Sequence, residues 1–243
     1  MIGFIGYGNM GGALVRAFLS HGVPADEIMI STRSPEKLKP LLDEYSISVV
    51  SQDEIQSADI LFLCVRSNDA LSVLKQLTSF KGHLVSINGG ILLKDLSSVY
   101  SGPVTKAMPS LTVEVSRGII LLCHNEVCHA PQAVEELFSK VGNVEIMPEC
   151  RFPAAENITG CSPALFARFA EILAESSGFS SEESLRMAKE TLIATALLLD
   201  ERELSLSDLI KKVATKGGIT EKGLRVMDDE IPKIVKKMFE SMH

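Results

Sequence analysis

"MIGFIGYGNMGGALVRAFLSHG" (residues 1–22) decides the fold of the first half of the chain. Its opening apolar run is typical of a buried strand, and "GALVRAFLSHG" has the apolar spacing of a helix that stops at a glycine. Between them stands "GYGNMG", the context that the G-x-G-x-x-G dinucleotide fingerprint requires. Gly6 would form the tight turn, Gly8 would admit a pyrophosphate, and Gly11 would let the helix approach the strand. The alternative is a glycine-rich turn without a ligand.

The alternation of strand and helix patterns continues beyond this unit. We expect strands at 28–32, 47–50, 58–65, 83–87, 103–108, 118–122 and 143–147, and helices at 68–77 and 131–140. Such a series predicts an α/β fold with a parallel, doubly wound sheet. Ligands of these sheets bind beyond the carboxyl ends of the strands.

The end of the second expected strand favours NADP(H) as the dinucleotide. NAD-binding proteins usually carry Asp or Glu there, but this chain has Thr32, Arg33 and Ser34. Asp26 and Glu27 stand at the other end of the strand. A guanidinium can form bidentate contacts with a 2′-phosphate, which an acidic residue would repel. Ser34 can also cap the next helix, and both roles are compatible.

Three further segments follow expected strand ends: "VRSND" from Val65, "NGG" from Asn88, and "MPS" from Met108. Each is placed to contact a ligand at the carboxyl edge of the sheet. Each could equally be a plain turn, because Gly, Pro, Asn and Ser are turn residues.

The strand patterns stop near residue 154, and amphipathic helices follow at 163–178, 180–201, 204–213 and in the final 22 residues. Ser180 and Glu183 have the spacing of a capping box. The apolar stripes are wide for so small a bundle, which predicts packing against a second copy. The alternative is that they cover only the bundle core and the nucleotide domain. We therefore expect a dinucleotide-binding domain at 1–153 and a helical dimerisation and substrate-binding domain at 154–243.

Composition limits the class of protein. The 243 residues are 46% apolar and 23% charged, with a net charge of −7, so we expect a normal core and neither nucleic acid nor an anionic membrane as partner. The N-terminus lacks the basic region of a signal peptide, and no apolar run approaches the ~20 residues of a membrane span. Five irregularly spaced cysteines indicate reduced thiols in the cytoplasm.

One segment, "CHNEVCH" (residues 123–129), has two cysteines and two histidines. Zinc sites usually need a second pair of ligands further along the chain, and the sequence shows none that completes this pattern. We therefore expect no metal.

Taken together, these motifs resemble those of the pyrroline-5-carboxylate reductase family over essentially the whole chain. The glycine loop at residues 6–11 is similar to the family's GxGxMG opening, and Val65-Arg66-Ser67 stands where the family has V-K-P. Asn88-Gly89-Gly90 takes the place of A-A-G and Met108-Pro109-Ser110 that of M-P-N. Residues 159–165, "TGCSPAL", are similar to S-G-S-G-P-A-[YF], and residues 215–220, "TKGGIT", to S-P-G-G-[TA]-T.

The resemblance implies an N-terminal Rossmann domain, a helical dimerisation domain, and NADPH-dependent reduction of 1-pyrroline-5-carboxylate to proline by a homodimer or larger homo-oligomer. It implies cofactor contacts from Gly6, Tyr7, Gly8, Asn9, Met10, Gly11, Thr32, Arg33, Ser34, Cys64, Val65, Arg66, Asn88, Gly89, Met108 and Pro109. It implies substrate contacts from Thr215, Lys216, Gly217, Gly218, Ile219 and Thr220, with Thr159 and Thr220 as catalytic hydroxyls.

The properties of a helix N-terminus agree with a substrate-binding role for residues 215–220. Gly217 and Gly218 let backbone N–H groups turn toward an anion at a helix start, and Lys216 adds charge attraction. The alternative is a helix break that only reverses the chain direction.

The expected chemistry is hydride transfer to a cyclic imine. An imine can carry its own proton, so positioning matters more than a strong general acid, whereas a ketone would need a proton donor. "AAENITGCSPALFARF" has no lysine to act as that donor. Departures from the family pattern, at Lys216, Ser162, Leu165, Asn88-Gly89 and Arg66-Ser67, leave three hypotheses: a proline-forming reductase, a reductase of another imine or acid, and a non-catalytic NADP-binding regulator.

Overall fold

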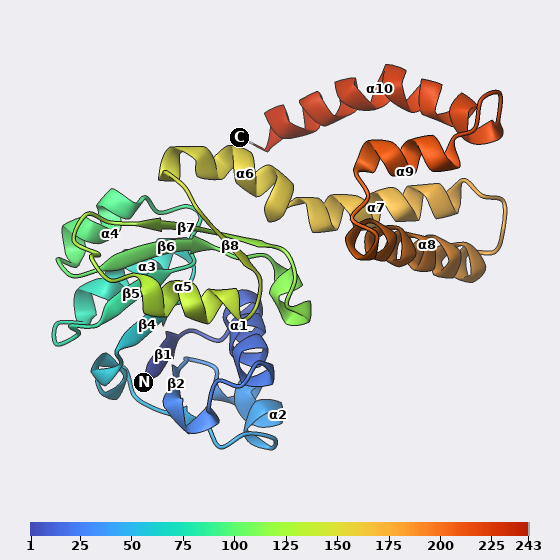
Figure 1. Cartoon of the computed structure of the whole chain (residues 1–243). Helices are drawn as coiled ribbons and strands as arrows, with labels where there is room; N and C mark the ends of the chain where they lie inside the picture. The colour runs from blue at the N-terminus through green and yellow to red at the C-terminus, as the bar shows by residue number, and fades with distance from the viewer. Residues whose placement is uncertain (243) are drawn as a thin grey trace. The chain divides into compact units, whose positions relative to one another are not determined.

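The computed structural model describes residues 1–242. The chain forms two compact units, one spanning Met1–Pro163 and the other starting at Ala164 (Figure 1). The first unit includes α6 (Phe152–Thr159), which contacts strand β7. The boundary between the compact units therefore lies later in the chain than 153/154. The boundary at 153/154 stays our prediction for the division between the two functional domains.

The first unit is built on one sheet with the strand order β3-β2-β1-β4-β5-β6-β7-β8. The strands are β1 (Ile2–Ile5), β2 (Ile28–Ser31), β3 (Ser48–Val49), β4 (Ile60–Leu63), β5 (His83–Ser86), β6 (Val104–Met108), β7 (Ile119–His124) and β8 (Asn143–Ile146). The predicted doubly wound α/β fold is confirmed. Two strands depart from the parallel pattern, since β7 runs antiparallel to β6 and β8 runs parallel to β7. The segment between β6 and β7, 109–118, is too short for the crossover that a parallel pair needs.

Helices cover both faces of this sheet. They are α1 (Asn9–Ser20), α2 (Lys39–Leu42), α3 (Ser67–Gln76), α4 (Leu93–Val99), α5 (Gln132–Ser139) and α6, with 3₁₀ turns η1 (Ala25–Glu27), η2 (Pro35–Leu38), η3 (Glu54–Ser57), η4 (Leu111–Val115) and η5 (Glu149–Arg151). One core contains α1 and α5 side chains and a stacked pair, Phe4 and Phe62, whose ring centroids lie 4.7 Å apart. The other core contains side chains of α3 and α4. The two cores fix the strand ends where the predicted site residues stand.

The second unit consists of α7 (Ser162–Glu175, which begins at the end of the first unit), α8 (Ser181–Glu201), α9 (Leu206–Val213) and α10 (Ile219–Ser241). Ser180 caps α8, as its spacing from Glu183 predicted: Ser180 Oγ accepts from the backbone N–H of Glu183 at 3.4 Å and donates to Glu183 Oε2 at 2.6 Å. No helix among residues 1–242 has the length and apolar content needed to cross a membrane.

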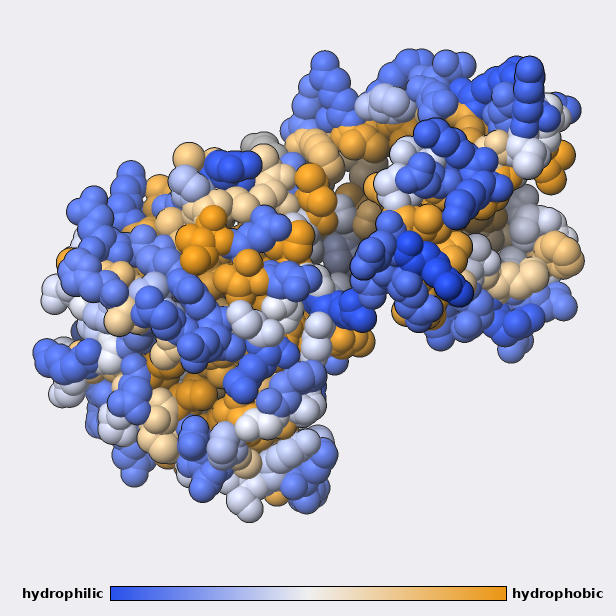
Figure 2. Space-filling view, viewed as in Figure 1, coloured by the Kyte–Doolittle hydropathy of each residue, from blue (hydrophilic) through white to orange (hydrophobic). Residues whose placement is uncertain are grey.

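This helical unit has almost no core of its own. Between residues 164 and 242, the structure buries only Ala174 and Ser184. Large apolar side chains of its helices are exposed, and Figure 2 shows apolar surface on this unit between charged residues. They include Phe166, Phe169, Leu173, Leu192, Leu197, Leu206, Val213, Val226 and Ile234. A single copy therefore leaves apolar faces in contact with water.

Candidate active site

The fingerprint loop between β1 and α1 needs glycine at two positions for different reasons. Gly6 has a φ of +96°, and a Cβ there would lie 2.6 Å from the carbonyl oxygen of Cys64. A Cβ on Gly11 would lie 2.9 Å from the carbonyl oxygen of Gly6 and 3.0 Å from Cys64 Cβ. Gly8 differs, since nothing lies within 4 Å of the position its Cβ would take. The loop is thus tight on the protein side and open at Gly8, where a ligand can approach the backbone.

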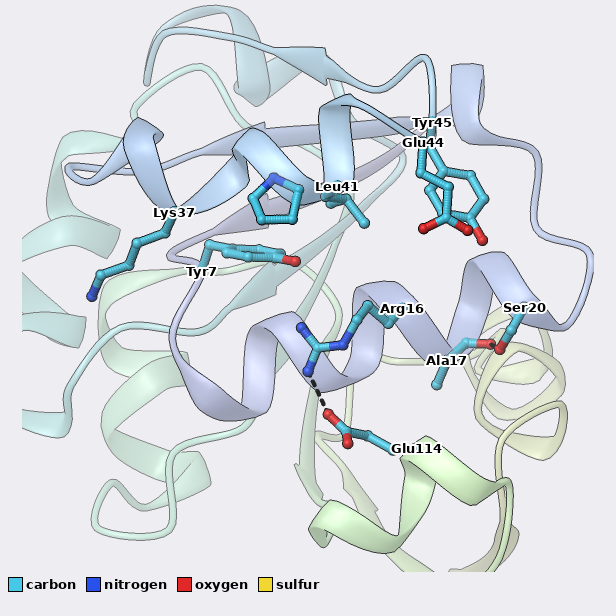
Figure 3. Close-up of a pocket in the computed structure, with 10 residues that line it drawn as sticks. Tyr7, Arg16, Ala17, Ser20, Lys37, Leu41, Glu44, Tyr45 and Glu114 are labelled. Carbon is cyan, nitrogen blue, oxygen red and sulfur yellow. Dashed lines mark hydrogen bonds and ion pairs between the residues drawn. The ribbon is translucent and has the colours of Figure 1, made fainter.

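The start of α1 offers backbone donors to that open side. Gly8 is its N-cap and no side chain caps it, while Asn9 is exposed and Met10 half-buried. Uncapped N–H groups at a helix N-terminus attract anions. Tyr7 presents only its backbone here, because its ring packs beside Gly12. That ring lines a pocket of ≈ 450 Å³ together with Lys37 and the Arg16–Glu114 ion pair (Figure 3).

Beyond β2, the segment expected to bind a 2′-phosphate is held by local contacts. Thr32 Oγ1 accepts from the backbone N–H of Ser34 at 3.2 Å. Arg33 is 86% exposed, and its Nη2 lies 3.0 Å from Oδ2 of Asp69, in the first turn of α3. Sequence reasoning missed Asp69, because it stands 36 positions from Arg33 in the chain. An anion that binds Arg33 has to compete with this carboxylate.

The three segments predicted at the carboxyl edge do meet there. Asn88 is buried, its Nδ2 donates to the carbonyl oxygen of Leu63 at 3.2 Å, and its Oδ1 accepts from Ser67 Oγ at 3.4 Å. A Cβ on Gly90 would lie 3.2 Å from Ser67 Oγ, and one on Gly89 would lie 3.2 Å from Cε of Met108. Asn88 thus joins the ends of β4 and β5 and the start of α3.

These contacts separate inward-facing residues from those free to touch a ligand. Cys64 packs under the glycine loop, and burial raises the pKa of its thiol. Val65 is half-buried, with a methyl group 3.3 Å from the position of a Gly6 Cβ. Arg66 is exposed as the N-cap of α3, and Pro109 is half-buried after β6. Within these segments, the Cys64 side chain packs against the glycine loop and the Asn88 side chain is hydrogen-bonded to other residues of the chain, so neither is available to a ligand.

A buried ion pair that the sequence did not reveal supports the same edge. Lys106 Nζ lies 2.7 Å from Glu149 Oε1 and donates to the carbonyl oxygen of Gly89 at 3.2 Å. The two oxygens of Glu149 accept from the backbone N–H of Leu93 at 2.9 and 3.1 Å. The pair therefore holds both ends of the loop from Gly89 to the first residue of α4.

Thr159 lies at the end of α6, where its Oγ1 donates to the carbonyl oxygen of Ala155 at 3.1 Å. The hydroxyl is half-buried and would have to leave this bond to donate to a ligand. Glu156, on the same helix, has an oxygen 3.8 Å from the position of a Gly89 Cβ. This carboxylate beside the "NGG" loop was also missed from the sequence.

The loop from Thr215 to Thr220 belongs to the second unit and starts α10. Gly217 has a φ of +78°, and its N–H donates to Glu221 Oε2 at 2.6 Å. That hydrogen bond, with a smaller contribution from Arg225, lowers the pKa of Glu221. Gly218 is the N-cap without a side-chain partner. The loop predicted to bind an anion thus lies at a helix start, but one of its backbone donors is already bound to a carboxylate of the chain.

The remaining residues of this loop differ in surroundings. Thr215 accepts at its carbonyl oxygen from Gly218 N at 2.9 Å, while Lys216 is exposed and Ile219 is 88% exposed. Thr220 lines an apolar groove within the unit, together with Ala194, Leu198, Ile210 and Leu224. The Thr220 hydroxyl thus lies beside both this apolar groove and the N-terminus of α10.

Comparisons with known proteins agree on one family. A family model described as NADP oxidoreductase coenzyme F420-dependent matches residues 1–88, and one described as pyrroline-5-carboxylate reductase dimerisation matches residues 149–243. Pyrroline-5-carboxylate reductase 3 of Bacillus subtilis is 30% identical over 254 residues, covering 98% of this chain and 93% of that protein. ComE operon protein 4 of Bacillus subtilis is 27% identical over 255 residues, covering 100% and 93%.

A solved structure shows the same fold. The pyrroline carboxylate reductase of Plasmodium falciparum, crystallised with NADP bound, has a TM-score of 0.85 over 99% of this chain and 94% of that one, at 22% identity.

Proposed function

The chain belongs to the pyrroline-5-carboxylate reductase family, and from this premise we propose that it reduces 1-pyrroline-5-carboxylate to proline with NADPH. The observation that carries the proposal is the glycine loop, tight at Gly6 and Gly11 and open at Gly8, in a chain similar to reductases over its whole length.

The residues of the first unit fit a dinucleotide phosphate. The open backbone at Gly8 and the uncapped start of α1 suit the pyrophosphate, and Arg33 suits a 2′-phosphate. The Plasmodium relative binds NADP, which supports the same cofactor here. When bound, NADPH supplies the hydride.

The chain's own part in the reaction is positioning. Asn88 and Lys106 hold the loops at the carboxyl edge of the sheet in place. In our proposal Gly218 and Thr220, at the start of α10, bind the substrate carboxylate, and the exposed Lys216 attracts it. Because the imine can bring its own proton, no strong general acid is required. Thr159 and Thr220 are the proposed hydroxyl partners of the substrate.

We further propose that two copies pair through their helical units. The second unit buries only two of the residues described between 164 and 242, too few for a stable bundle. The family model that covers this unit is one for dimerisation. We assign the reaction to the cytoplasm, since all five cysteines are free thiols.

A second candidate is an NADP-binding protein that reduces another imine or has lost turnover. The similarity to ComE operon protein 4, whose name is not that of a reductase, favours this candidate. The position of Glu221 favours it as well, because its carboxylate would repel a substrate carboxylate at the start of α10. Mixing purified protein with NADPH and 1-pyrroline-5-carboxylate, and following the loss of NADPH absorbance, separates the two. Turnover that is faster with NADPH than with NADH supports the reductase. Tight NADPH binding without turnover on this imine supports the second candidate, and a screen of other cyclic imines then tests for a different substrate.

A further inference from the structure

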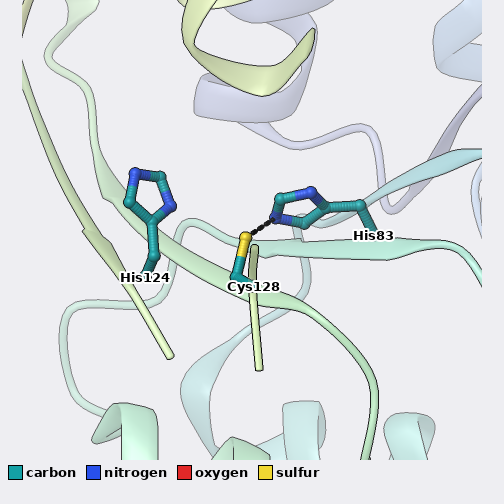
Figure 4. Close-up of side chains that lie close together, drawn as sticks. All are labelled: His83, His124 and Cys128. Carbon is teal, nitrogen blue, oxygen red and sulfur yellow. Dashed lines mark hydrogen bonds between the residues drawn. The ribbon is translucent and has the colours of Figure 1, made fainter. Parts of the chain in front are cut away.

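Three side chains that can bind a metal meet at the amino edge of the parallel strands, opposite the glycine loop. His83 is the first residue of β5, His124 the last of β7, and Cys128 lies in the loop that follows. Their ligand atoms all lie within 4.8 Å of one another (Figure 4). The antiparallel direction of β7 is the cause, because it brings the end of that strand to the same edge of the sheet as the beginnings of β5 and β6.

One ligand pair already has the spacing of a zinc site. His83 Nε2 lies 3.6 Å from Cys128 Sγ, and Figure 4 shows the sulfur directed at the imidazole ring. In a tetrahedral site with Zn–N near 2.0–2.1 Å and Zn–S near 2.3 Å, these atoms stand about 3.6 Å apart. A small shift of His124 completes a three-ligand set.

The hydroxyl of Thr105 lies between the two imidazoles. Thr105 Oγ1 is 2.7 Å from His83 Nε2 and 2.8 Å from His124 Nδ1. A hydroxyl has one proton and two lone pairs, so at least one of the two rings donates to it. Both rings therefore already direct a nitrogen at one point. An ion can take the place of the hydroxyl as their shared partner once Thr105 rotates.

Glu135, on α5, lies on the other side of the His124 ring, with its Oε1 3.2 Å from His124 Nε2. The two atoms do not meet hydrogen-bond geometry, and Nε2 has no other hydrogen-bond partner among residues 1–242. A small rotation of either side chain would let Glu135 accept the Nε2 proton in a hydrogen bond, which leaves Nδ1 as the nitrogen that faces the cluster.

We propose that His83, His124 and Cys128 bind one zinc-class divalent cation, with water in the fourth position. Imidazole and thiolate ligands select zinc over magnesium or calcium. Sequence spacing did not reveal this cluster, because His83 stands 45 positions before Cys128 in the chain. The ion would tie β5 to β7 and to the loop after it. It lies away from the proposed hydride transfer, since the four residues of β5 span about 10 Å at ~3.3 Å each.

The test is metal content after equilibrium dialysis of the full chain against buffered Zn²⁺, with Co²⁺ as a spectroscopic probe. We expect one ion per chain, a thiolate-to-cobalt charge-transfer band, and a Tm that rises by about 5–10 °C when free zinc is a hundredfold above Kd. Cys128→Ser and His83→Gln should each lose the ion and the band. Cys150→Ser and His129→Gln change exposed residues of the same types and should keep both.

A further variant separates a metal site from a cluster held only by hydrogen bonds. Thr105→Val removes the bridging hydroxyl and leaves all three ligands, so it should still bind one ion and gain Tm with zinc. A wild-type chain that binds no zinc overturns the proposal. So does equal loss of the ion in the Cys128 and Cys150 variants, or full retention in a folded Cys128→Ser variant, with folding checked by circular dichroism.

Discussion

Lys106 and Glu149 form an ion pair with 2.7 Å between Nζ and Oε1, and the ammonium group also donates to the carbonyl oxygen of Gly89. Only 4% of the Lys106 side chain and 21% of the Glu149 side chain are exposed. Lys106 on β6 and Glu149, 43 positions later in the chain, thus hold the "NGG" loop in place.

Removing one member of this pair should destabilise the chain strongly. Lys106→Met leaves the Glu149 carboxylate without its cation, and we expect the free energy of unfolding to fall by about 3–5 kcal/mol in urea denaturation. The double variant Lys106→Met/Glu149→Gln keeps an acceptor for Leu93 N–H and removes the buried charge, so it should regain much of the loss. A double variant as unstable as the single one would contradict this account.

Arg33 and Asp69 should affect cofactor choice in opposite directions. Arg33→Ala should weaken NADPH binding about tenfold or more, since charged hydrogen bonds are worth about 1.5–3 kcal/mol, and should leave NADH binding nearly unchanged. Asp69→Asn should strengthen NADPH binding up to about fivefold, because an exposed pair is worth at most about 1 kcal/mol. Dissociation constants from nicotinamide fluorescence measure both. Equal losses for NADPH and NADH in Arg33→Ala would remove Arg33 from the 2′-phosphate site.

Substitutions at Gly6 and at Gly8 should separate an effect on folding from an effect on cofactor binding. Gly6→Ala places a Cβ 2.6 Å from the Cys64 carbonyl oxygen at a φ of +96°, so we expect a marked loss of Tm. Gly8→Val adds bulk in open space, so Tm should stay near the wild-type value while NADPH affinity falls. If Gly8→Val instead binds NADPH normally, the pyrophosphate lies elsewhere.

Thr220 and Glu221 test the loop of the second unit. Thr220→Val should raise KM for 1-pyrroline-5-carboxylate, whereas Thr220→Ser keeps the hydroxyl and should change it little. Glu221→Gln removes a negative charge from the α10 start while it can still accept from Gly217 N–H, so KM should fall. Steady-state kinetics with the imine varied provide both values. An unchanged KM in Thr220→Val and Glu221→Gln alike would remove this loop from the substrate site.

Local patterns predicted the parts of the fold that depend on neighbours in the sequence. The glycine loop, the helix cap at Ser180 and most strand positions follow from spacing alone. The helix α4 was missed, because "LKDLSSV" is short and only weakly patterned. The reversal of β7 depends on the length of chain that follows β6, which periodicity does not report.

The candidate site was less predictable, because its supporting contacts join distant positions. The side chains of Arg33 and Asp69 meet across 36 positions, and those of Lys106 and Glu149 across 43. The position of Asn88 at a strand end correctly indicated the carboxyl edge, but not that its amide would be satisfied by Leu63 and Ser67. Sequence spacing carries no information on such pairings until the sheet order is known.

The lack of a core in the helical unit has a consequence for how the protein is made. The unit that ends at Pro163 leaves the ribosome first and has its own core, so it can fold while synthesis continues. The later helices, which bury only Ala174 and Ser184 between residues 164 and 242, would have to find those of another chain. The rate of assembly would then depend on the square of the concentration of newly made chains. A cell that expresses two variants of the chain would form mixed dimers.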